Sequence, residues 1–127
     1  MMERVETLEA PQAIGPYSQA IRSGDFLFVS GQIPLNPKSG TLVEGGIEVQ
    51  TGQVMKNIQA ILKAAKLDLG RIVKTTVFLK NMDDFSTFNS VYEKFLREPF
   101  PARATVEVSR LPKNVLIEIE AVAYALA

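Results

Sequence analysis

The segment from Val115 to Tyr124 constrains the fold of this chain more than any other feature. Side chains alternate between the two faces of a β-strand, so every second residue shares a face. One face of this segment is apolar throughout, with Val115, Ile117, Ile119, Ala121 and Ala123. The other face carries Leu116 and Val122 beside two glutamates. We therefore expect a strand within a sheet that has apolar side chains on both faces.

Periodicity in the rest of the chain predicts two helices and further strands. Helical spacing from about residue 48 to 65 aligns the apolar side chains in one stripe. A second helix, capped by Asp83 or Asp84, ends before Pro99. Its stripe is Phe85, Phe88, Tyr92 and Phe95. Strands are predicted near Val5 and over residues 19–22, 26–30, 72–79, 104–108 and 115–124.

This order of elements predicts a single domain, residues 1–127, with an α+β sandwich fold and both helices on one face of the sheet. Two helices leave the opposite face wet, although several strands carry apolar side chains there. Burying apolar surface is worth roughly 25 cal/mol per Å². We therefore predict an oligomer that closes the open face.

The absence of His and Cys constrains the chemistry. It excludes thiolate nucleophiles, serine–histidine catalysis and zinc hydrolysis of the usual kinds, so proton transfer falls to Glu, Asp, Tyr, Lys or bound water. Fourteen basic and fourteen acidic residues cancel, which argues against nucleic-acid binding. The charged N-terminal segment is not a signal peptide and no apolar run reaches membrane-spanning length, so we expect a cytoplasmic protein.

Arg103 and Glu118 stand out among the charged residues. Arg103 follows Phe100-Pro101-Ala102 at the start of a strand, and Glu118 interrupts an apolar strand together with Glu120. If the last two strands form an antiparallel hairpin, Arg103 can lie near Glu118. The pair then forms either a modest salt bridge or a guanidinium fork for a substrate carboxylate with a nearby proton-transfer group. The glutamates can equally lie on a solvated face, and spacing does not choose between these alternatives.

Three other places offer candidate ligand contacts. Asn89 borders the apolar stripe of the second helix, where it either reaches solvent or faces a cleft. Tyr17 follows Gly15-Pro16 and is either a packed loop aromatic or a ligand contact. Ser30-Gly31-Gln32 is turn-like, and Gly31 lets another group approach the backbone closely.

Several segments together resemble the RidA (reactive intermediate deaminase A) group of the YjgF-type family. The similarity covers nearly the whole chain in the same order. The segments that carry it are Ala13-Ile14-Gly15-Pro16-Tyr17-Ser18-Gln19-Ala20, Ser30-Gly31-Gln32-Ile33-Pro34, Val73-Lys74-Thr75-Thr76-Val77-Phe78-Leu79, Phe100-Pro101-Ala102-Arg103 and Ile117-Glu118-Ile119-Glu120-Ala121.

The resemblance implies a chorismate-mutase-like α+β sandwich, with a mixed sheet, assembled as a homotrimer around a central barrel. Ligand clefts would lie between subunits. The implied activity is hydrolysis of 2-imino acids such as 2-iminobutanoate and 2-iminopropanoate, or their enamine tautomers, to 2-oxo acids and ammonia. These intermediates leak from pyridoxal-phosphate-dependent dehydratases. The enzyme itself would need no cofactor and no metal.

The resemblance also assigns roles to residues. Arg103 would hold the substrate carboxylate, Glu118 would hold or activate the attacking water, and the backbone around Thr105 would help to position that water. Other cleft residues would be Tyr17, Ser30, Gly31, Asn89 and Phe100.

Two positions depart from the family pattern. Thr105 stands where relatives often have Cys, and Lys66 stands where they often have Gly. Because Gly suits the left-handed residue after a helix, we expect Lys66 either to adopt a positive φ or to end the helix differently.

Two other functions remain open for the same fold. One is a ligand-binding or regulatory trimer without catalysis, although retention of both Arg103 and Glu118 argues against binding alone. The other is a ribonuclease-type translation inhibitor, which the zero net charge and the missing His weaken.

Overall fold

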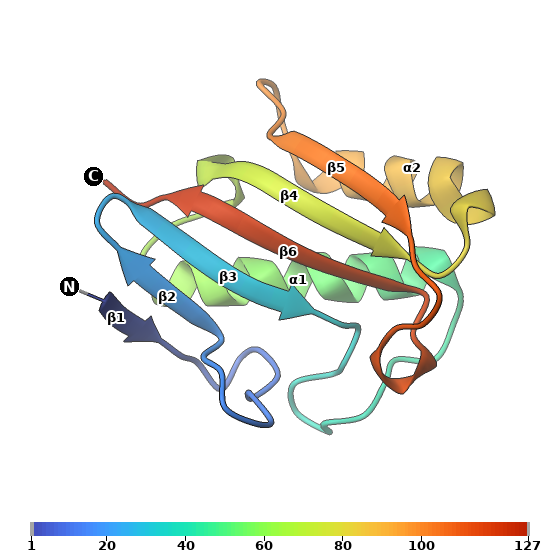
Figure 1. The fold of residues 1–127 in the computed structure, drawn as a ribbon, viewed down its shortest axis with the longest axis horizontal. Helices are drawn as coiled ribbons and strands as arrows, with labels where there is room; N and C mark the ends of the chain where they lie inside the picture. Colours follow the sequence, from blue (N-terminus) through green and yellow to red (C-terminus); the bar gives the residue numbers. More distant parts are fainter. Residues whose placement is uncertain (1, 127) are drawn as a thin grey trace.

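The computed structural model describes residues 2–126 and contains one mixed sheet with two α-helices (Figure 1). The strands lie in the order β1-β2-β3-β6-β4-β5. Their bounds are β1 Met2–Val5, β2 Ala20–Ser23, β3 Phe26–Gln32, β4 Ile72–Leu79, β5 Ala102–Glu107 and β6 Ile117–Tyr124. The helices are α1 Ile47–Ala64 and α2 Phe85–Phe95, and short 3₁₀ turns cover Leu69–Arg71, Met82–Asp84 and Pro112–Asn114. The predicted α+β fold and the predicted elements are confirmed.

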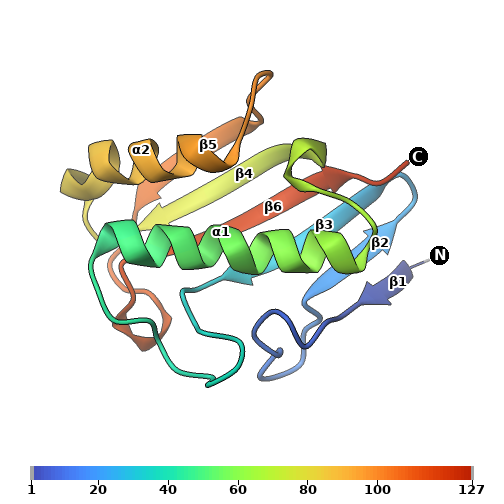
Figure 2. The same cartoon turned by 180° about the vertical axis from the view of Figure 1, so that it is seen from behind.

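Both helices lie on the same face of the sheet, as predicted (Figure 2). The core forms between α1 and the central strands β3, β6 and β4. Helix α1 contributes the predicted stripe, in which Val54, Ile58, Ile61 and Leu62 are fully buried. Strand β6 contributes Ile117, Ile119, Ala121 and Ala123 to the same layer, so the alternation that dominates the sequence selects the helix-covered face.

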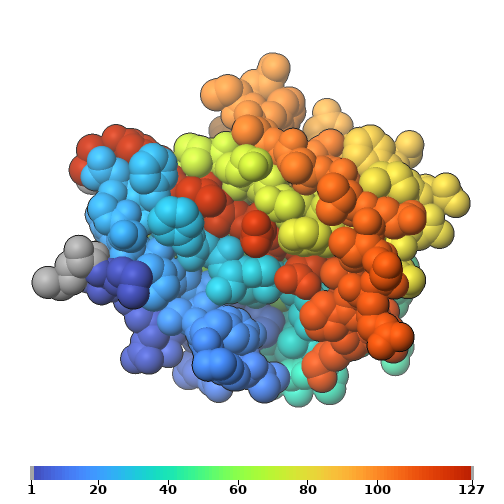
Figure 3. All heavy atoms as spheres, viewed as in Figure 1, coloured from blue at the N-terminus to red at the C-terminus, as the bar shows by residue number. Residues whose placement is uncertain are grey.

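The opposite face of the sheet, which we call the open face, has no helix over it (Figure 3). Phe26, Phe28 and Tyr124 project from β3 and β6 on this side and remain between 37% and 49% exposed. The rings of Phe26 and Tyr124 contact each other edge to face, with centroids 5.8 Å apart. Exposed aromatic side chains grouped in this way are consistent with the predicted oligomer, which stays a prediction.

The pairing of β5 differs from the expected hairpin. Strand β4 lies between β5 and β6, and β5 runs parallel to β4, with Arg103 beside Thr75 in the register. The reason is the connection, because α2 joins β4 to β5 as a crossover, and a crossover makes its two strands parallel. The condition that would bring the two residues together is therefore not met, and Arg103 is not a cross-strand neighbour of Glu118.

The helix ends agree only in part with the predictions. Asp84 occupies the N-cap position of α2, but its side chain makes no capping hydrogen bond. The Asn81 side chain instead caps the preceding 3₁₀ turn by accepting a hydrogen bond from the Asp83 N–H at 2.9 Å. Lys66 adopts φ 63° after α1, as one of the two expected outcomes, and the Leu67 N–H closes the helix on the Leu62 carbonyl at 2.8 Å.

No helix within residues 2–126 combines the length and the apolar character needed to cross a membrane.

Candidate active site

The side chain of Arg103 lies on the helix-covered side of β5, the edge strand of the sheet. Its guanidinium carbon is 5.5 Å from the ring centre of Phe85, 5.3 Å from Phe88 and 5.2 Å from Tyr92, all on α2. A guanidinium at such distances is attracted to the electron-rich ring faces. The predicted apolar stripe of α2 therefore has a second role, because it forms an aromatic wall for a cation.

Asn89 fixes one edge of the same guanidinium. Its Oδ1 accepts a hydrogen bond from Arg103 Nη1 at 2.8 Å, which selects the cleft-facing alternative for this residue. An arginine carries five N–H donors in a planar fork. No carboxylate within residues 2–126 forms an ion pair with Arg103, since the ion pair found there joins Arg4 to Glu6. The charge of Arg103 and most of its donors are therefore free for a ligand.

A pocket of about 390 Å³ opens beside Arg103. Phe100 and Pro101 supply an apolar wall, and α2 supplies the opposite side. The lining residues are Asn89, Tyr92, Glu93, Phe100, Pro101 and Arg103, which we call the arginine pocket. A fork of donors next to an apolar wall suits a small molecule with a carboxylate and a short alkyl group. Sequence reasoning missed Tyr92 and Glu93, although they follow Asn89 by three and four positions and so share its side of the helix.

The contact between Asn89 and Arg103 leads to a test by a near-isosteric change. In Asn89→Asp a carboxylate replaces the amide 2.8 Å from Nη1 and competes with a ligand carboxylate for the fork. We expect KM for a small carboxylate substrate to rise about 10- to 100-fold, while the exposed new pair changes the free energy of unfolding by at most about 1 kcal/mol. Steady-state kinetics and urea unfolding measure both. Asn81→Asp adds the same charge near the start of α2 and should leave KM unchanged; equal KM values for the two variants would contradict this view of the pocket.

Glu118 lies on the open face of β6, next to an irregularity in β3. Ser30 and Gly31 of β3 face one residue of β6, because Val29 pairs with Ala121 and Gln32 pairs with Ile119. Such a bulge re-aims the strand and is common beside active sites. The Glu118 carboxylate rests against Gly31, where an added Cβ would overlap Oε2. The expected close approach at Gly31 is therefore made by the carboxylate of Glu118.

Partial burial sets the proton affinity of Glu118. Burial raises the pKa of its carboxyl above the ordinary value of 4.5, and the neighbouring negative charge of Glu120 raises that pKa further. A carboxyl with a raised pKa is a stronger base when ionised and stays protonated to a higher pH, so it can serve as a proton acceptor and as a proton donor. Within residues 2–126, no group of three or more His, Cys, Asp or Glu side chains is arranged to hold a metal ion.

Gly31 gives a second test, because its missing side chain makes room for Glu118. In Gly31→Ala the Glu118 carboxylate must move, but it is the end of a flexible side chain, so we expect folding to survive. A displacement of about 1 Å can lower a rate roughly 100-fold, and we expect kcat to fall by about that factor. Gly52→Ala is the matched control, since a Cβ there meets open space. Unchanged kcat in Gly31→Ala would show that the position of Glu118 does not matter.

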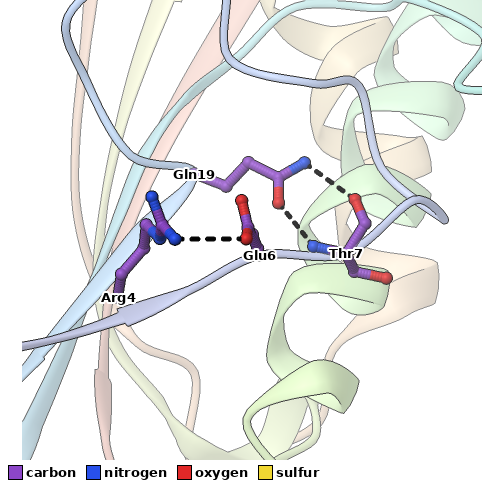
Figure 4. Close-up of polar contacts among 4 residues, drawn as sticks. All are labelled: Arg4, Glu6, Thr7 and Gln19. Carbon is purple, nitrogen blue, oxygen red and sulfur yellow. Dashed lines mark hydrogen bonds and ion pairs between the residues drawn. The ribbon is translucent and has the colours of Figure 1, made fainter.

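Ser30 connects Glu118's surroundings to the loop that carries Tyr17. The Ser30 hydroxyl donates to the Ser18 carbonyl at 2.5 Å, and the Ser30 N–H donates to the Gln19 carbonyl at 2.9 Å. The buried Gln19 side chain then anchors the N-terminal segment, since its Oε1 accepts from the Thr7 N–H at 2.7 Å and its Nε2 donates to the Thr7 carbonyl (Figure 4). Tyr17 is 52% exposed on this anchored loop, so it is not a packed aromatic.

The predicted site residues thus form two groups on opposite faces of the sheet. Arg103, Asn89 and Phe100 belong to the arginine pocket. Glu118 and Gly31 lie together on the other side, with Ser30 and the Tyr17 loop beside them; we call this group the glutamate site. Thr105 joins neither group through its side chain, because its hydroxyl is buried and has no hydrogen-bond partner among residues 2–126.

The family model described as Endoribonuclease L-PSP matches residues 7–125. The chain belongs to this family. Among members of the Endoribonuclease L-PSP family and their relatives, a RutC family protein of Pyrococcus horikoshii is 57% identical over 98% of each chain. The 2-iminobutanoate/2-iminopropanoate deaminase of Escherichia coli is 51% identical over 97% of this chain and 98% of its own.

Solved structures agree with this assignment. The crystal structure of RidA from an Antarctic Psychrobacter matches with a TM-score of 0.93 at 42% identity, covering 96% of this chain and 98% of that one. The expected membership in the RidA group and the expected fold are therefore confirmed. The names used within the Endoribonuclease L-PSP family refer to different activities. The family model is named for an endoribonuclease, and the family includes imine deaminases.

Proposed function

We propose that this chain is a cytoplasmic 2-imino acid deaminase that hydrolyses 2-iminobutanoate, 2-iminopropanoate and their enamine tautomers to 2-oxo acids and ammonia. The observation that carries the proposal is the guanidinium of Arg103, which lies in a pocket with its charge unpaired by any described carboxylate. The 51% identity to a deaminase of that name supports it.

Arg103 binds the substrate carboxylate through the donors that Asn89 leaves free. The short alkyl group of the substrate packs against Phe100 and Pro101. Because the iminium carbon is already electrophilic, orientation and a placed water account for most of what catalysis requires. This explains how a chain without His or Cys can carry out the reaction.

Glu118 moves the proton. As the water oxygen bonds to C2 of the imine, the Glu118 carboxylate accepts a proton from that water, and the C=N double bond becomes a single bond. The protonated carboxyl then donates this proton to the nitrogen. The C–N bond breaks and ammonia leaves, while the hydroxyl on C2 gives its remaining proton back to the Glu118 carboxylate and becomes the carbonyl oxygen. The ammonia takes up that last proton and departs as ammonium, which regenerates the carboxylate. The raised pKa of Glu118 favours both transfers, because the carboxylate is a stronger base and its acid form persists to a higher pH than in an ordinary glutamate. Tyr17, Ser30 and the Thr105 backbone complete the cleft in this proposal.

The two groups of residues need a second subunit to act on one substrate, since they lie on opposite faces of a single sheet. We propose a homotrimer in which the arginine pocket of one subunit faces the glutamate site of the next. The exposed aromatic residues of the open face support an interface there, because a C₃ assembly buries a heterologous contact three times over.

A coupled assay tests the function. A threonine dehydratase generates the imine from threonine, and 2-oxobutanoate is measured by absorbance as it forms. Addition of the purified chain should accelerate 2-oxobutanoate formation above the spontaneous rate at equal dehydratase activity. Equal rates with and without the chain would refute the proposed function. RNA cleavage by the same preparation that survives Arg103→Ala would point to a contaminant or to a different site.

A further inference from the structure

Tyr92 connects the sheet, helix α2 and Arg103 in one closed arrangement. Its hydroxyl lies 2.7 Å from the Thr75 hydroxyl, a hydrogen bond in which either oxygen can be the donor. Its ring stands 5.2 Å from the Arg103 guanidinium. Thr75 is itself the residue of β4 that pairs with Arg103 of β5. Tyr92 therefore contacts both Thr75 and Arg103, which are themselves neighbours in the pairing of β4 with β5.

The hydrogen bond between Thr75 and Tyr92 is buried. Thr75 and Tyr92 are 1% and 5% exposed, so both hydroxyls are nearly shielded from water and depend on each other for a partner. Phe85 and Phe88 also face the guanidinium, but neither has a polar group that ties it to the sheet. Within the aromatic wall, Tyr92 alone is anchored by a hydrogen bond.

An anchored aromatic wall favours substrate binding because it lowers the entropic cost of fixing the Arg103 side chain. It is an exposed residue on an edge strand, and a free arginine side chain loses about 2 kcal/mol of rotamer entropy when it is fixed. If the wall holds the guanidinium before substrate arrives, that entropy is not lost on binding. The deletion of one hydroxyl in the wall should then weaken carboxylate binding without affecting proton transfer at Glu118.

We propose that Tyr92 and Thr75 are positioning residues that hold Arg103 in its carboxylate-binding orientation through their mutual hydrogen bond. This inference rests on the proposed role of Arg103 as the carboxylate-binding residue, and it adds two buried hydroxyls to the residues that determine substrate affinity. In this proposal the two hydroxyls act through Arg103, because they bond each other.

The test compares Tyr92→Phe, Thr75→Val and the double variant with the wild type. Each single variant removes one hydroxyl and keeps the shape of the side chain. We expect KM to rise about three- to tenfold in each single variant, the size of one net hydrogen bond, with kcat changed less than twofold. The double variant should be no worse than either single variant, because both remove the same hydrogen bond. Thr75→Ser keeps the hydroxyl and should restore the wild-type KM.

Binding is measured separately from catalysis, by calorimetric titration of 2-oxobutanoate, the carboxylate-bearing product. Its Kd should rise by the same factor as KM in Tyr92→Phe and Thr75→Val and return in Thr75→Ser. Unchanged Kd, or effects of the two variants that multiply in the double variant, would overturn the inference, as would a Thr75→Ser variant that behaves like Thr75→Val. If the wild type binds 2-oxobutanoate with this dependence but hydrolyses no imine, the proposed function fails and the positioning role stands.

Discussion

Replacement of Arg103 by alanine should lower kcat/KM for 2-iminobutanoate by about 1000-fold. The variant loses a bidentate, charge-assisted contact, in which each hydrogen bond is worth roughly 1.5–3 kcal/mol, within a pocket that holds no other described cation. The loss should appear in the coupled assay and as the disappearance of 2-oxobutanoate binding. Arg103→Lys should recover little, because an ammonium cannot form the planar fork or stack on the three rings in the same way.

The control for Arg103→Ala is Arg97→Ala. Arg97 is an exposed arginine in the connection between α2 and β5 and does not line the arginine pocket. Its loss lowers the positive charge of the same region but removes no contact to the substrate, so kcat/KM should stay within about twofold. Equal activity in Arg103→Ala and the wild type would contradict the proposed carboxylate site.

Glu118→Gln should give the second large effect, a fall in kcat of about 100- to 10,000-fold, because a glutamine cannot accept the proton of the attacking water. KM should change little, since the carboxylate of the substrate is bound elsewhere. The two variants should differ in their binding of 2-oxobutanoate. Arg103→Ala should abolish it, whereas Glu118→Gln should retain it. A Glu118→Gln variant with normal kcat would exclude Glu118 as the proton-transfer group.

The same substitution should stabilise the fold at neutral pH. The folded-state pKa of Glu118 is raised, so the unfolded chain releases this proton at a lower pH than the folded chain does. As the pH rises from the unfolded-state pKa of Glu118 through its folded-state pKa, ionisation of this carboxyl lowers the free energy of unfolding of the wild type. Below both pKa values the carboxyl is protonated in both states and has no such effect. Glu118→Gln cannot ionise. Its melting temperature should therefore exceed that of the wild type at pH 7, and the difference should shrink toward zero as pH falls below about 4. Equal differences at both pH values would contradict the raised pKa.

The sequence predicts the local elements of this protein well, because each depends on a short periodic pattern. The stripe of α1 and the alternation of β6 are both set by residues a few positions apart, and both are found in the structure. Such patterns do not predict which strand β5 pairs with, because the pairing joins segments that lie far apart in the sequence. The order of β4, α2 and β5 is that of a crossover unit with parallel strands, whereas the order of β5 and β6 along the chain is equally compatible with a hairpin between them.

The candidate site divides in the same way. Arg103, Glu118 and Asn89 could be selected from the sequence as polar residues bordering apolar patterns or through the family resemblance. The contact of Glu118 with Gly31 depends on a bulge in β3, and no residue pattern states where an extra residue enters a strand. Tyr92 lies at an apolar position of the α2 stripe, so the sequence pattern predicts a packed ring. It does not predict the hydrogen bond of its hydroxyl to Thr75 or its contact with Arg103.

The placement of Arg103 and Glu118 on opposite faces of one sheet makes the proposed site depend on two subunits. Mixed trimers test this most directly. Arg103→Ala and Glu118→Gln chains, each inactive alone, are unfolded together in equal amounts, refolded, and assayed for 2-oxobutanoate formation. Random mixing should restore roughly a quarter of the wild-type activity per chain, because one interface in four then joins an intact Arg103 to an intact Glu118 of another subunit. Activity that stays at the level of the separate variants, although mixed trimers form, would contradict a site shared between subunits.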